Sequence, residues 1–512
     1  MQAQNYVIMS LIMYQKKDRK KEIARRTLIY ATMTVSLVVL LGVLLFMMLG
    51  YRFDPTTNTV EQAGLVQYSS FPRGAMVSID GTNLDKTPAK NMVMPGQHQF
   101  AMKLTGYETW QKPITVRSDT VTQLDYARLV PTERKVSDVR DATGLETAKF
   151  TANGRYVVGI GLNEESALIS LWGDLRNADS LKFTEQTIDT TLLAGYDDAS
   201  HPDRSPTKHS FLIYSWSENS RFVIVKHNYT IDGEATKTQW LRFDRENQTK
   251  FLNITDLVGF DIADAKFIGD GGDALYVLQS DGSVRRVRLD DSTISNPLVT
   301  GVEEFSLYDE KTIVFVASRD ETRVAGIWRE DWSEEQIVRT LTTSEKNYKM
   351  HIKASEYFNK DTVVVSVDET ATIYRGALPG TEAALEAFLQ TGKKISLGRA
   401  ATDVSMSDDG RFIILRDDAG FISYDLERAS LSAEIVLSGN KNLEWLDDFH
   451  VWQVDESGDL LMREFDGANP SKLLKSNPKY GSTLSSDGKY VYTFSETDGE
   501  LQLQRLAMTV KS

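Results

Sequence analysis

The stretch VSMSDDGRFIILRD (404–417) decides the fold of most of this chain. A short strand of alternating character leads into a turn of Asp and Gly, and a second strand rich in β-branched and aromatic residues follows. STLSSDGKYVYTFS (482–495) has the same pattern. Two apolar runs joined by a polar, Gly-containing turn predict an antiparallel β-hairpin.

This hairpin pattern occurs eight times after about residue 145. Each copy is followed by a third strand, such as FISYDLE (421–427). Residues 145–512 number 368, which is 46 for each of eight units. A four-stranded propeller blade needs about 40–50 residues. The predicted fold class is therefore mainly β, with a seven- or eight-bladed β-propeller over 145–512. The other six hairpins are at 150–161, 214–227, 267–279, 305–318, 357–367 and 443–455.

The last repeat lacks a fourth strand. RKVSDV (134–139), in a connector over 126–144, could supply that strand and close the ring. Closure is favoured because a blade buries its faces only against its neighbours. The one stretch with helical character, GTEAALEAFLQTGKK (380–394), is predicted to be an insertion in a single blade.

The turn-strand segments Ser407–Ile413 and Ser485–Val491 resemble those of WD40-like and TolB-like β-propellers. The resemblance implies a fold and leaves the ligand open. We interpret the Asp-Gly pairs in these segments as turn caps rather than metal ligands.

A second β-rich region begins with FPRGAMVSIDGTNLDKTP (71–88). Ala75, Val77 and Ile79 alternate with polar residues, as do the apolar residues of HQFAMKL (98–104), which predicts half-buried strands. Gly residues mark the turns, and a Pro ends one strand because it donates no ladder hydrogen bond. We predict a small antiparallel sandwich over 64–125.

The short motifs in this region resemble the PEGA domain, named for its Pro-Glu-Gly-Ala motif. Arg73 replaces the Glu of that motif here. The resemblance implies an extracellular β-sandwich of prokaryotic surface proteins and assigns no catalytic residue. We predict that the motif residues are structural, with the two aromatic ones in the core or at its rim. They are Pro72, Gly74, Ala75, Asp80, Gly81, Thr87, Pro88, Pro95, Gly96, Gly106, Tyr107 and Trp110.

An uncharged run, TLIYATMTVSLVVLLGVLLFMMLGY, occupies 27–51. At about 1.5 Å per residue, it is long enough to cross a hydrocarbon core of ~30 Å as a helix. A cleaved signal peptide would have a shorter apolar run and an Ala-x-Ala site, so we predict an anchor. Basic residues before the run predict a cytoplasmic tail (1–26), with a linker (52–63) beginning outside the membrane. These residues are Lys16, Lys17, Arg19, Lys20, Lys21, Arg25 and Arg26.

The composition excludes some classes of protein. The net charge of the 512 residues is −14, and the tail over 1–26 contributes +5, so the rest carries −14 − 5 = −19. An acidic body argues against binding nucleic acid. Cysteine is absent, which removes disulfides and thiolate chemistry, and favours a prokaryotic surface protein.

Motifs for catalysis or metal binding are missing. The six histidines form no His-Glu-x-x-His pair, and neither a Gly-x-Ser-x-Gly elbow nor a phosphate loop occurs. A calcium loop requires a closer spacing than that of four neighbouring aspartates, Asp261, Asp264, Asp270 and Asp273. We predict no cofactor, no metal and no catalytic residue.

The order of anchor, small module and large repeat region predicts a single-pass extracytoplasmic protein of the cell membrane. We expect a binding or structural role, with the propeller rim presenting the interaction surface to a surface protein or a cell-wall glycan. The alternative is a propeller enzyme acting on envelope glycans or peptides. Two carboxylates facing each other in the channel would favour that alternative.

Overall fold

The computed structural model describes residues 19–48, 50–54, 59–118, 120–193, 206–231, 235–342, 348–440 and 442–510. The chain divides into two compact units. Unit 1 comprises Met1–Lys103 and Gln111–Ala127, and unit 2 comprises Leu104–Trp110 and Arg128–Ser512.

Unit 1 begins with helix α1 (Arg19–Met48). Its segment Lys20–Met48 is long and apolar enough to cross a membrane, and none of its most apolar window is buried in protein. A signal sequence near an N-terminus meets the same criterion. Lys20, Lys21, Arg25 and Arg26 lie exposed in the first turns of α1, and Arg19 is its first residue, whereas Lys16 and Lys17 lie outside the described residues.

The segment predicted as a linker, 52–63, contains an antiparallel hairpin instead. Strand β1 (Tyr51–Asp54) pairs with β2 (Thr59–Gln62). The helix ends at Met48, three residues before the predicted end of the span, and the Tyr51 ring stacks on Phe46 at 5.0 Å. Strands of four residues are too short for alternation to reveal them.

The sandwich predicted over 64–125 consists of two antiparallel sheets. Its apolar positions alternate as expected, with Val77, Phe100, Met102 and Val116 at most 1% exposed. One sheet has the order β6 (Ala89–Val93), β3 (Gly64–Phe71), β9 (Val121–Arg128). The other has the order β5 (Thr82–Lys86), β4 (Met76–Ile79), β7 (Gly96–Lys103), β8 (Trp110–Val116).

Unit 2 contains eight successive antiparallel sheets, which we number in chain order. Each starts with one of the predicted hairpins and adds the predicted third strand. Their strands are, in sheet 1, β11 (Leu145–Phe150), β12 (Tyr156–Leu162), β13 (Leu168–Asp174) and β14 (Lys182–Ile188); in sheet 2, β15 (Pro206–Trp216), β16 (Phe222–Ile231), β17 (Lys237–Asp244) and β18 (Asn247–Asn253); in sheet 3, β19 (Ile262–Phe267), β20 (Ala274–Gln279), β21 (Val284–Arg288) and β22 (Thr293–Ile294); in sheet 4, β23 (Val302–Asp309), β24 (Thr312–Arg319), β25 (Thr322–Arg329) and β26 (Gln336–Thr342).

The second half of unit 2 continues the pattern. Sheet 6 carries one extra short strand. The strands are, in sheet 5, β27 (Met350–Glu356), β28 (Asp361–Val367), β29 (Thr370–Gly376) and β30 (Lys393–Ser396); in sheet 6, β31 (Asp403–Met406), β32 (Phe412–Arg416), β33 (Gly420–Asp425), β34 (Ser430–Leu431) and β35 (Ile435–Val436); in sheet 7, β36 (Glu444–Trp445), β37 (His450–Val454), β38 (Asp459–Glu464) and β39 (Ser471–Lys475); in sheet 8, β40 (Ser482–Leu484), β41 (Tyr490–Thr497), β42 (Glu500–Ala507) and β10 (Val136–Asp141).

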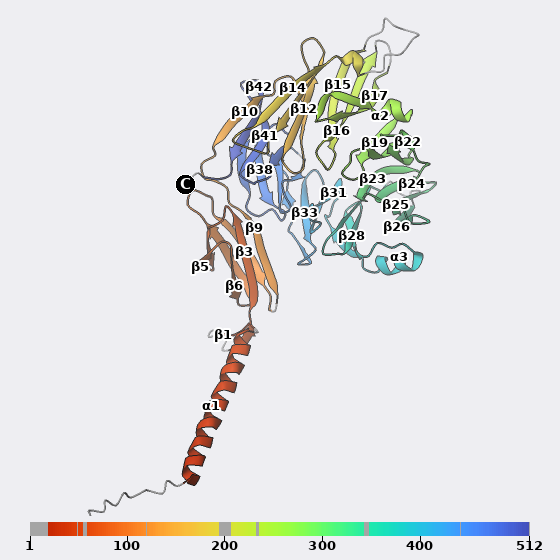
Figure 1. The fold of residues 1–512 in the computed structure, drawn as a ribbon. Helices are drawn as coiled ribbons and strands as arrows, with labels where there is room; N and C mark the ends of the chain where they lie inside the picture. Colours follow the sequence, from red (N-terminus) through yellow and green to blue (C-terminus); the bar gives the residue numbers. More distant parts are fainter. Residues whose placement is uncertain are drawn as a thin grey trace, which may run out of the picture. The chain divides into compact units, whose positions relative to one another are not determined.

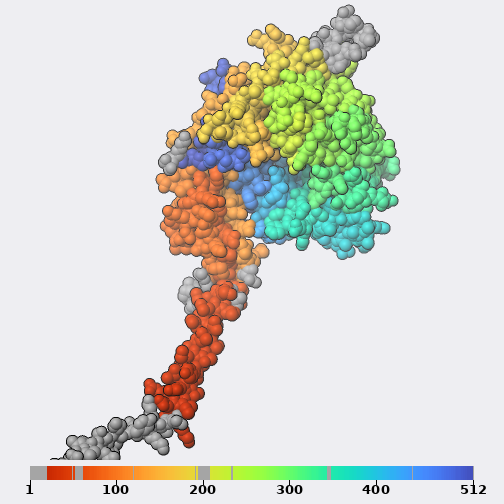
Figure 2. All heavy atoms as spheres, in the orientation of Figure 1, coloured from red at the N-terminus to blue at the C-terminus, as the bar shows by residue number. Residues whose placement is uncertain are grey.

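The order in which the sheets pack returns to its starting point. A separate apolar cluster lies between each sheet and the next, and one more joins sheet 8 to sheet 1, where Phe494 contacts Phe150. In Figures 1 and 2 the sheets follow one another from orange through green to blue, and the blue end lies beside the orange beginning. This arrangement is typical of a β-propeller.

Strand β10 completes sheet 8, as the missing fourth strand predicted. It pairs antiparallel with β42, with Val136 opposite Leu506 and Ser137 opposite Arg505. The observed strand, Val136–Asp141, lies two residues later than the predicted segment 134–139. The first and last parts of unit 2 therefore share one sheet.

Side-chain hydrogen bonds fix the repeated turns, which confirms their structural interpretation. Ser407 Oγ donates to Asp409 Oδ1 at 2.6 Å and accepts from Phe412 N at 3.0 Å. Gly410 follows with φ of 74°, which Gly adopts at little cost. Ser485 and Asp487 form the same arrangement.

Unit 2 also contains short helices within its described residues. Helix α3 (Glu382–Leu389) lies inside the predicted insertion, between β29 and β30, and Thr381 Oγ1 caps it by accepting from Ala384 N at 3.3 Å. The sequence did not predict α2 (Ile254–Val258) or the 3-10 turn Thr190–Leu192, because one turn of helix leaves no detectable period.

Candidate functional site

The first strands of neighbouring sheets in unit 2 lie close together, as β11 does to β15 and β23 to β27. They bond directly to one another across the sheet boundaries. Trp216 Nε1 on β15 donates to the carbonyl of Lys149 on β11 at 3.1 Å, and Lys353 Nζ on β27 donates to Ser306 Oγ on β23 at 2.8 Å. Sheets that radiate from one axis come closest at their inner edges, so these strands line that axis.

Titratable and charged side chains gather on these strands. Their neighbours in sequence, such as Ala265, Phe305 and Ile352, are buried between sheets, whereas the charged side chains alternate with them and reach water. We call this group the axial cluster, which also includes Arg416 from β32. Its members are Lys149, Asp264, Lys266, Glu304, His351, Lys353, Asp403, Arg416 and Glu444.

Most carboxylates of the axial cluster have a direct partner. Glu304 Oε2 lies 2.9 Å from His351 Nδ1, and Asp264 Oδ2 lies 3.0 Å from Lys266 Nζ. Burial opposes ionisation of Glu304. The bond to His351 and the charges of His351, Lys353 and Lys266 outweigh burial and lower the Glu304 pKa. Glu304 is therefore held as a carboxylate by groups of the two neighbouring sheets, 3 and 5.

Lys149 and Glu444 interact although their sheets are not direct neighbours. They belong to sheets 1 and 7, which have sheet 8 between them, yet the charge of each acts on the other. Both side chains are exposed to solvent, although protein atoms nearby remove part of their hydration. Burial lowers the pKa of Lys149, and the charge of Glu444 offsets only part of this effect. Burial also raises the pKa of Glu444, against the charges of Lys149 and Arg416.

A cavity of about 790 Å³, which we call the axial cavity, opens where β15, β19 and β23 end. Tyr214, Trp216, Lys266 and Tyr308 line it. The Tyr214 hydroxyl donates to Asp264, and the Tyr308 hydroxyl donates to Asp361. Burial and these carboxylates raise the pKa of both phenols, so both stay protonated at neutral pH.

One wall of the axial cavity is acidic. Glu218 and Glu310 line this wall, and Asp270 lies beside it. Burial raises the pKa of Glu218, and the charges of Asp270 and Glu310 raise it further. The cavity thus combines aromatic surface, one lysine and crowded carboxylates.

None of the PEGA-like motif residues lines this cavity, and they have structural contacts of their own. The Pro72–Ala75 turn is fixed by Thr87, which is 4% exposed. Its Oγ1 accepts from Gly74 N at 3.1 Å and from Ala75 N at 3.0 Å. Pro88 follows Thr87 directly, between β5 and β6.

The turn dipeptides of the motif connect strands as predicted. Asp80 and Gly81 have φ of 51° and 82° in the tight turn between β4 and β5, and Asp80 Oδ1 accepts from Gln99 N at 2.8 Å. Pro95 and Gly96 occupy the turn from β6 into β7.

The last motif residues, 104–110, belong to unit 2 rather than to unit 1. Gly106 O accepts from Thr132 N at 2.9 Å, and the Tyr107 hydroxyl accepts from Val510 N at 2.7 Å. Trp110 is 2% exposed, and its indole N–H donates to Glu464 on β38. The two aromatic residues were predicted to lie in the sandwich core or at its rim, and their hydrogen bonds are made with residues of unit 2.

The histidines and the aspartates singled out in the sequence do not assemble into one site. Asp264 is paired with Lys266, whereas Asp273 accepts from Arg242 at 3.0 Å, so these two aspartates have separate partners. His209 and His227 stack on each other, while His201 lies outside the described residues. Within the described residues, no group of three His, Cys, Asp or Glu could hold a metal ion.

Sequence analysis did not find the axial cluster. Lys149 and Glu444 are 444 − 149 = 295 residues apart, so no motif joins them. A signal was present in two first strands, since TAKF (147–150) and DAKF (264–267) place a lysine at the same position between apolar residues. A charged residue inside an otherwise buried strand marks a face that meets water.

Comparison with known proteins identifies the small domain. Residues 64–132 match the family model of the PEGA domain. This match ends at residue 132, seven residues beyond the end of the predicted sandwich at residue 125. No curated protein matches the chain in sequence.

Solved structures resemble the chain only distantly. An oligogalacturonate lyase in complex with manganese shares 10% identity over 60% of this chain and 98% of its own, with a TM-score of 0.38. An oligogalacturonate lyase from Vibrio parahaemolyticus shares 10% over 73% and 96%, with a TM-score of 0.37. Apo AztD from Citrobacter koseri shares 9% over 80% and 98%, with a TM-score of 0.37. Similarity this low carries no argument about the ligand of this protein.

Proposed function

We propose that this protein is a single-pass surface protein whose second unit, a closed eight-bladed β-propeller, binds a partner at its axial cavity. The return of the packing order to sheet 1 and the pairing of β10 with β42 support closure. The PEGA domain match supports a location outside the cytoplasm. The partner is a surface protein or a cell-wall glycan, and the acidic body disfavours nucleic acid.

The membrane arrangement rests on α1. The apolar part, Thr27–Met48, spans about 33 Å at 1.5 Å per residue, which matches a hydrocarbon core of ~30 Å. Lys20, Lys21, Arg25 and Arg26 cluster at its N-terminal end, and such residues stay in the cytoplasm. The PEGA-like sandwich and unit 2 then lie outside, extracellular or periplasmic, and the lipid bilayer is a first partner through α1.

The observation that carries the binding role is the axial cavity. It is concave and open, and Tyr214, Trp216 and Tyr308 reach it from two sheets. Pockets that place aromatic surface beside a few fixed polar groups are typical binding sites. Trp and Tyr also contribute most strongly to protein interfaces. The partnered carboxylates of the axial cluster favour binding over catalysis.

A capture experiment tests this role. The full chain in detergent serves as bait for envelope fractions, with or without prior protease treatment of the fraction to separate protein from glycan partners. We expect Trp216→Ala to lower retention about 30-fold, which corresponds to ~2 kcal/mol for a buried aromatic anchor. Trp332→Ala, a tryptophan outside the axial cavity, serves as the control. Equal retention by both variants, or none at any salt concentration, would refute a binding role.

The second candidate is an enzyme acting on envelope glycans or peptides. One observation favours it, since Lys149 and Glu444, which interact from sheets 1 and 7, have pKa values shifted toward their neutral forms. Such pairs are used for proton transfer. If the captured material is cleaved by the wild type and left intact by Glu444→Gln, catalysis replaces binding as the function.

A further inference from the structure

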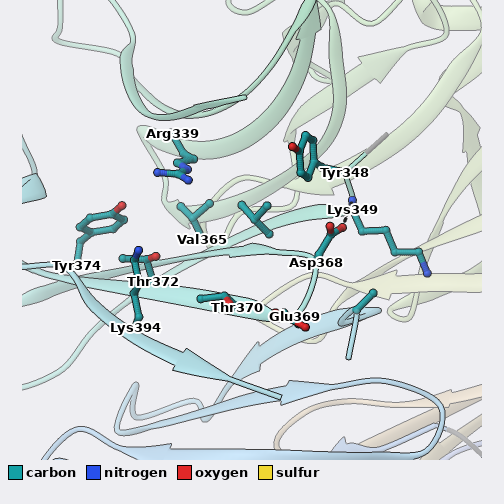
Figure 3. A pocket seen from close by; sticks show the side chains of 12 residues that line it. Arg339, Tyr348, Lys349, Val365, Asp368, Glu369, Thr370, Thr372, Tyr374 and Lys394 are labelled. Atoms are coloured by element: carbon teal, nitrogen blue, oxygen red, sulfur yellow. Dashed lines mark hydrogen bonds between the residues drawn. The ribbon is translucent and has the colours of Figure 1, made fainter. Parts of the chain in front are cut away.

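A second cavity lies between sheets 4 and 5, and residues that lead into β27 and β31 also line it. It has a volume of about 680 Å³, and we call it the lateral cavity. Strands β26, β28, β29 and β30 contribute its walls (Figure 3). It shares no lining residue with the axial cavity. Three cations (Arg339, Lys349 and Lys394) and two carboxylates (Asp368 and Glu369) line it, together with Val365, Thr370, Thr372 and Tyr374.

Tyr374 gives the lateral cavity a wall that is fixed by packing. The residue is 6% exposed, and its ring stacks on Phe388 of α3 at 5.9 Å. Its hydroxyl has no hydrogen-bond partner in the part of the chain that the structure describes, and Figure 3 shows it turned into the cavity. A phenol whose ring is fixed in this way can donate its hydroxyl hydrogen bond to a ligand in the cavity. Thr370 and Thr372 alternate with buried residues on the same strand and add two hydroxyls to this wall.

Two cations at the lateral cavity lack carboxylate partners. Neighbouring arginines of sheet 4 are paired, Arg319 with Glu335 and Arg323 with Glu303. Arg339 and Lys394 form no ion pair within the described residues, although the chain has 72 Asp and Glu against 58 Lys and Arg. Figure 3 shows Arg339 on the side of the cavity opposite Tyr374 and Lys394.

We propose that the lateral cavity binds an anionic saccharide. A carboxylate or phosphate would lie between Arg339 and Lys394, because guanidinium and ammonium groups form charge-assisted bonds to both. The Tyr374 hydroxyl donates to the same group or to its sugar. The threonine hydroxyls match the hydroxyls of a polyol, and Val365 supplies a small apolar floor. A lipid tail would need a larger apolar wall than this one.

The test measures binding of three monosaccharides to the full chain in detergent by saturation-transfer NMR titration. The probes are glucuronic acid, glucose 6-phosphate and neutral glucose. We expect the anionic probes to bind at least tenfold more tightly than glucose. Binding of one anionic probe alone also supports the proposal and identifies the charged group. If glucose binds as tightly as both anions, or no probe binds, the proposal is wrong.

Variants locate the binding. Arg339→Gln and Lys394→Gln should each weaken the anionic probe about tenfold, and Tyr374→Phe, which keeps the stacking on Phe388, should weaken it severalfold. Lys250→Gln removes an exposed cation from β18 and should change nothing. An Arg339→Gln variant that binds like the wild type would overturn the assignment. Trp216→Ala should leave this binding intact, so failure at the axial cavity and failure here are distinguishable.

Discussion

The buried histidine of sheet 2 predicts that the protein loses stability in mild acid. His227 on β16 is 0% exposed and stacks on Phe211 at 4.5 Å. Its Nδ1 lies 2.9 Å from Gln239 Nε2, which can only donate. The Nε2 proton is therefore the one donated to His209 Nδ1, at 2.9 Å. A second proton on Nδ1 would face the amide N–H of Gln239.

Burial, and then the charge of His209, lowers the pKa of His227 from 6.5 to about 3. The folded pKa is depressed, so the unfolded chain binds the proton first. Stability is complete above pH 6.5 and falls as the pH drops toward 3. From 2.303RT ≈ 1.36 kcal/mol per unit, the loss between pH 7.5 and pH 5 is about 2 kcal/mol for this one residue.

Urea unfolding of the full chain in detergent, followed by tryptophan fluorescence at pH 7.5 and pH 5, measures this loss. His227→Phe removes the titrating group and two hydrogen bonds, so it lowers stability at pH 7.5 while shrinking the difference between the two pH values by about 2 kcal/mol. Val225→Ala, a cavity variant on the same strand and also 0% exposed, controls for destabilisation alone and keeps the full difference. An unchanged difference in His227→Phe would refute the argument.

Two further predictions concern the packing of unit 2. Arg411 and Asp425 form a buried bidentate pair, with bonds of 3.1 and 2.8 Å, and Asp425→Asn should cost about 3–5 kcal/mol in urea unfolding because it leaves the guanidinium partly uncompensated. Replacement of both residues by Met and Leu should cost less, and an equal cost would contradict this reasoning. A Cβ on Gly154 would lie 1.9 Å from the carbonyl oxygen of Leu484, so Gly154→Ala should destabilise the contact of sheets 1 and 8 by more than 2 kcal/mol. Gly481→Ala controls for the left-handed backbone alone, since it has φ of 70° and open space around its Cβ, and a cost equal to that of Gly154→Ala would argue against the contact.

The repeat pattern predicted most strands of unit 2 because each hairpin meets the same physical demands. Its buried strands need β-branched residues, and its turns need a capping Ser and a residue with positive φ, as at Ser407 and Gly410. The absence of a fourth strand in the last repeat was enough to identify β10. The hairpin β1–β2 and helix α2 escaped prediction because their short segments carry too few residues to show a period.

The axial residues escaped prediction for a different reason. Packing between neighbouring sheets fixes which positions of a first strand are buried, as at Ala148 and Ala265, and this requirement repeats in every sheet. It places no demand on the alternate positions that face the axis. Those positions hold Lys149 in sheet 1, Ser306 in sheet 4 and Glu444 in sheet 7. The repeat therefore predicts where a binding residue can lie and leaves its identity free.

The same reasoning explains why the candidate sites lie where they do. In a ring of sheets, both faces of every sheet are buried against neighbouring sheets. Polar and charged groups are therefore left to the inner edge, the outer edge and the turns. The axial cavity uses the inner edge, where side chains from several sheets converge, and the lateral cavity lies between sheets 4 and 5, where Tyr374 stacks on Phe388 of α3. Only one sheet carries such a helical insertion within the described residues. The lateral cavity therefore depends on a departure from the repeat, whereas the axial cavity depends on the repeat itself.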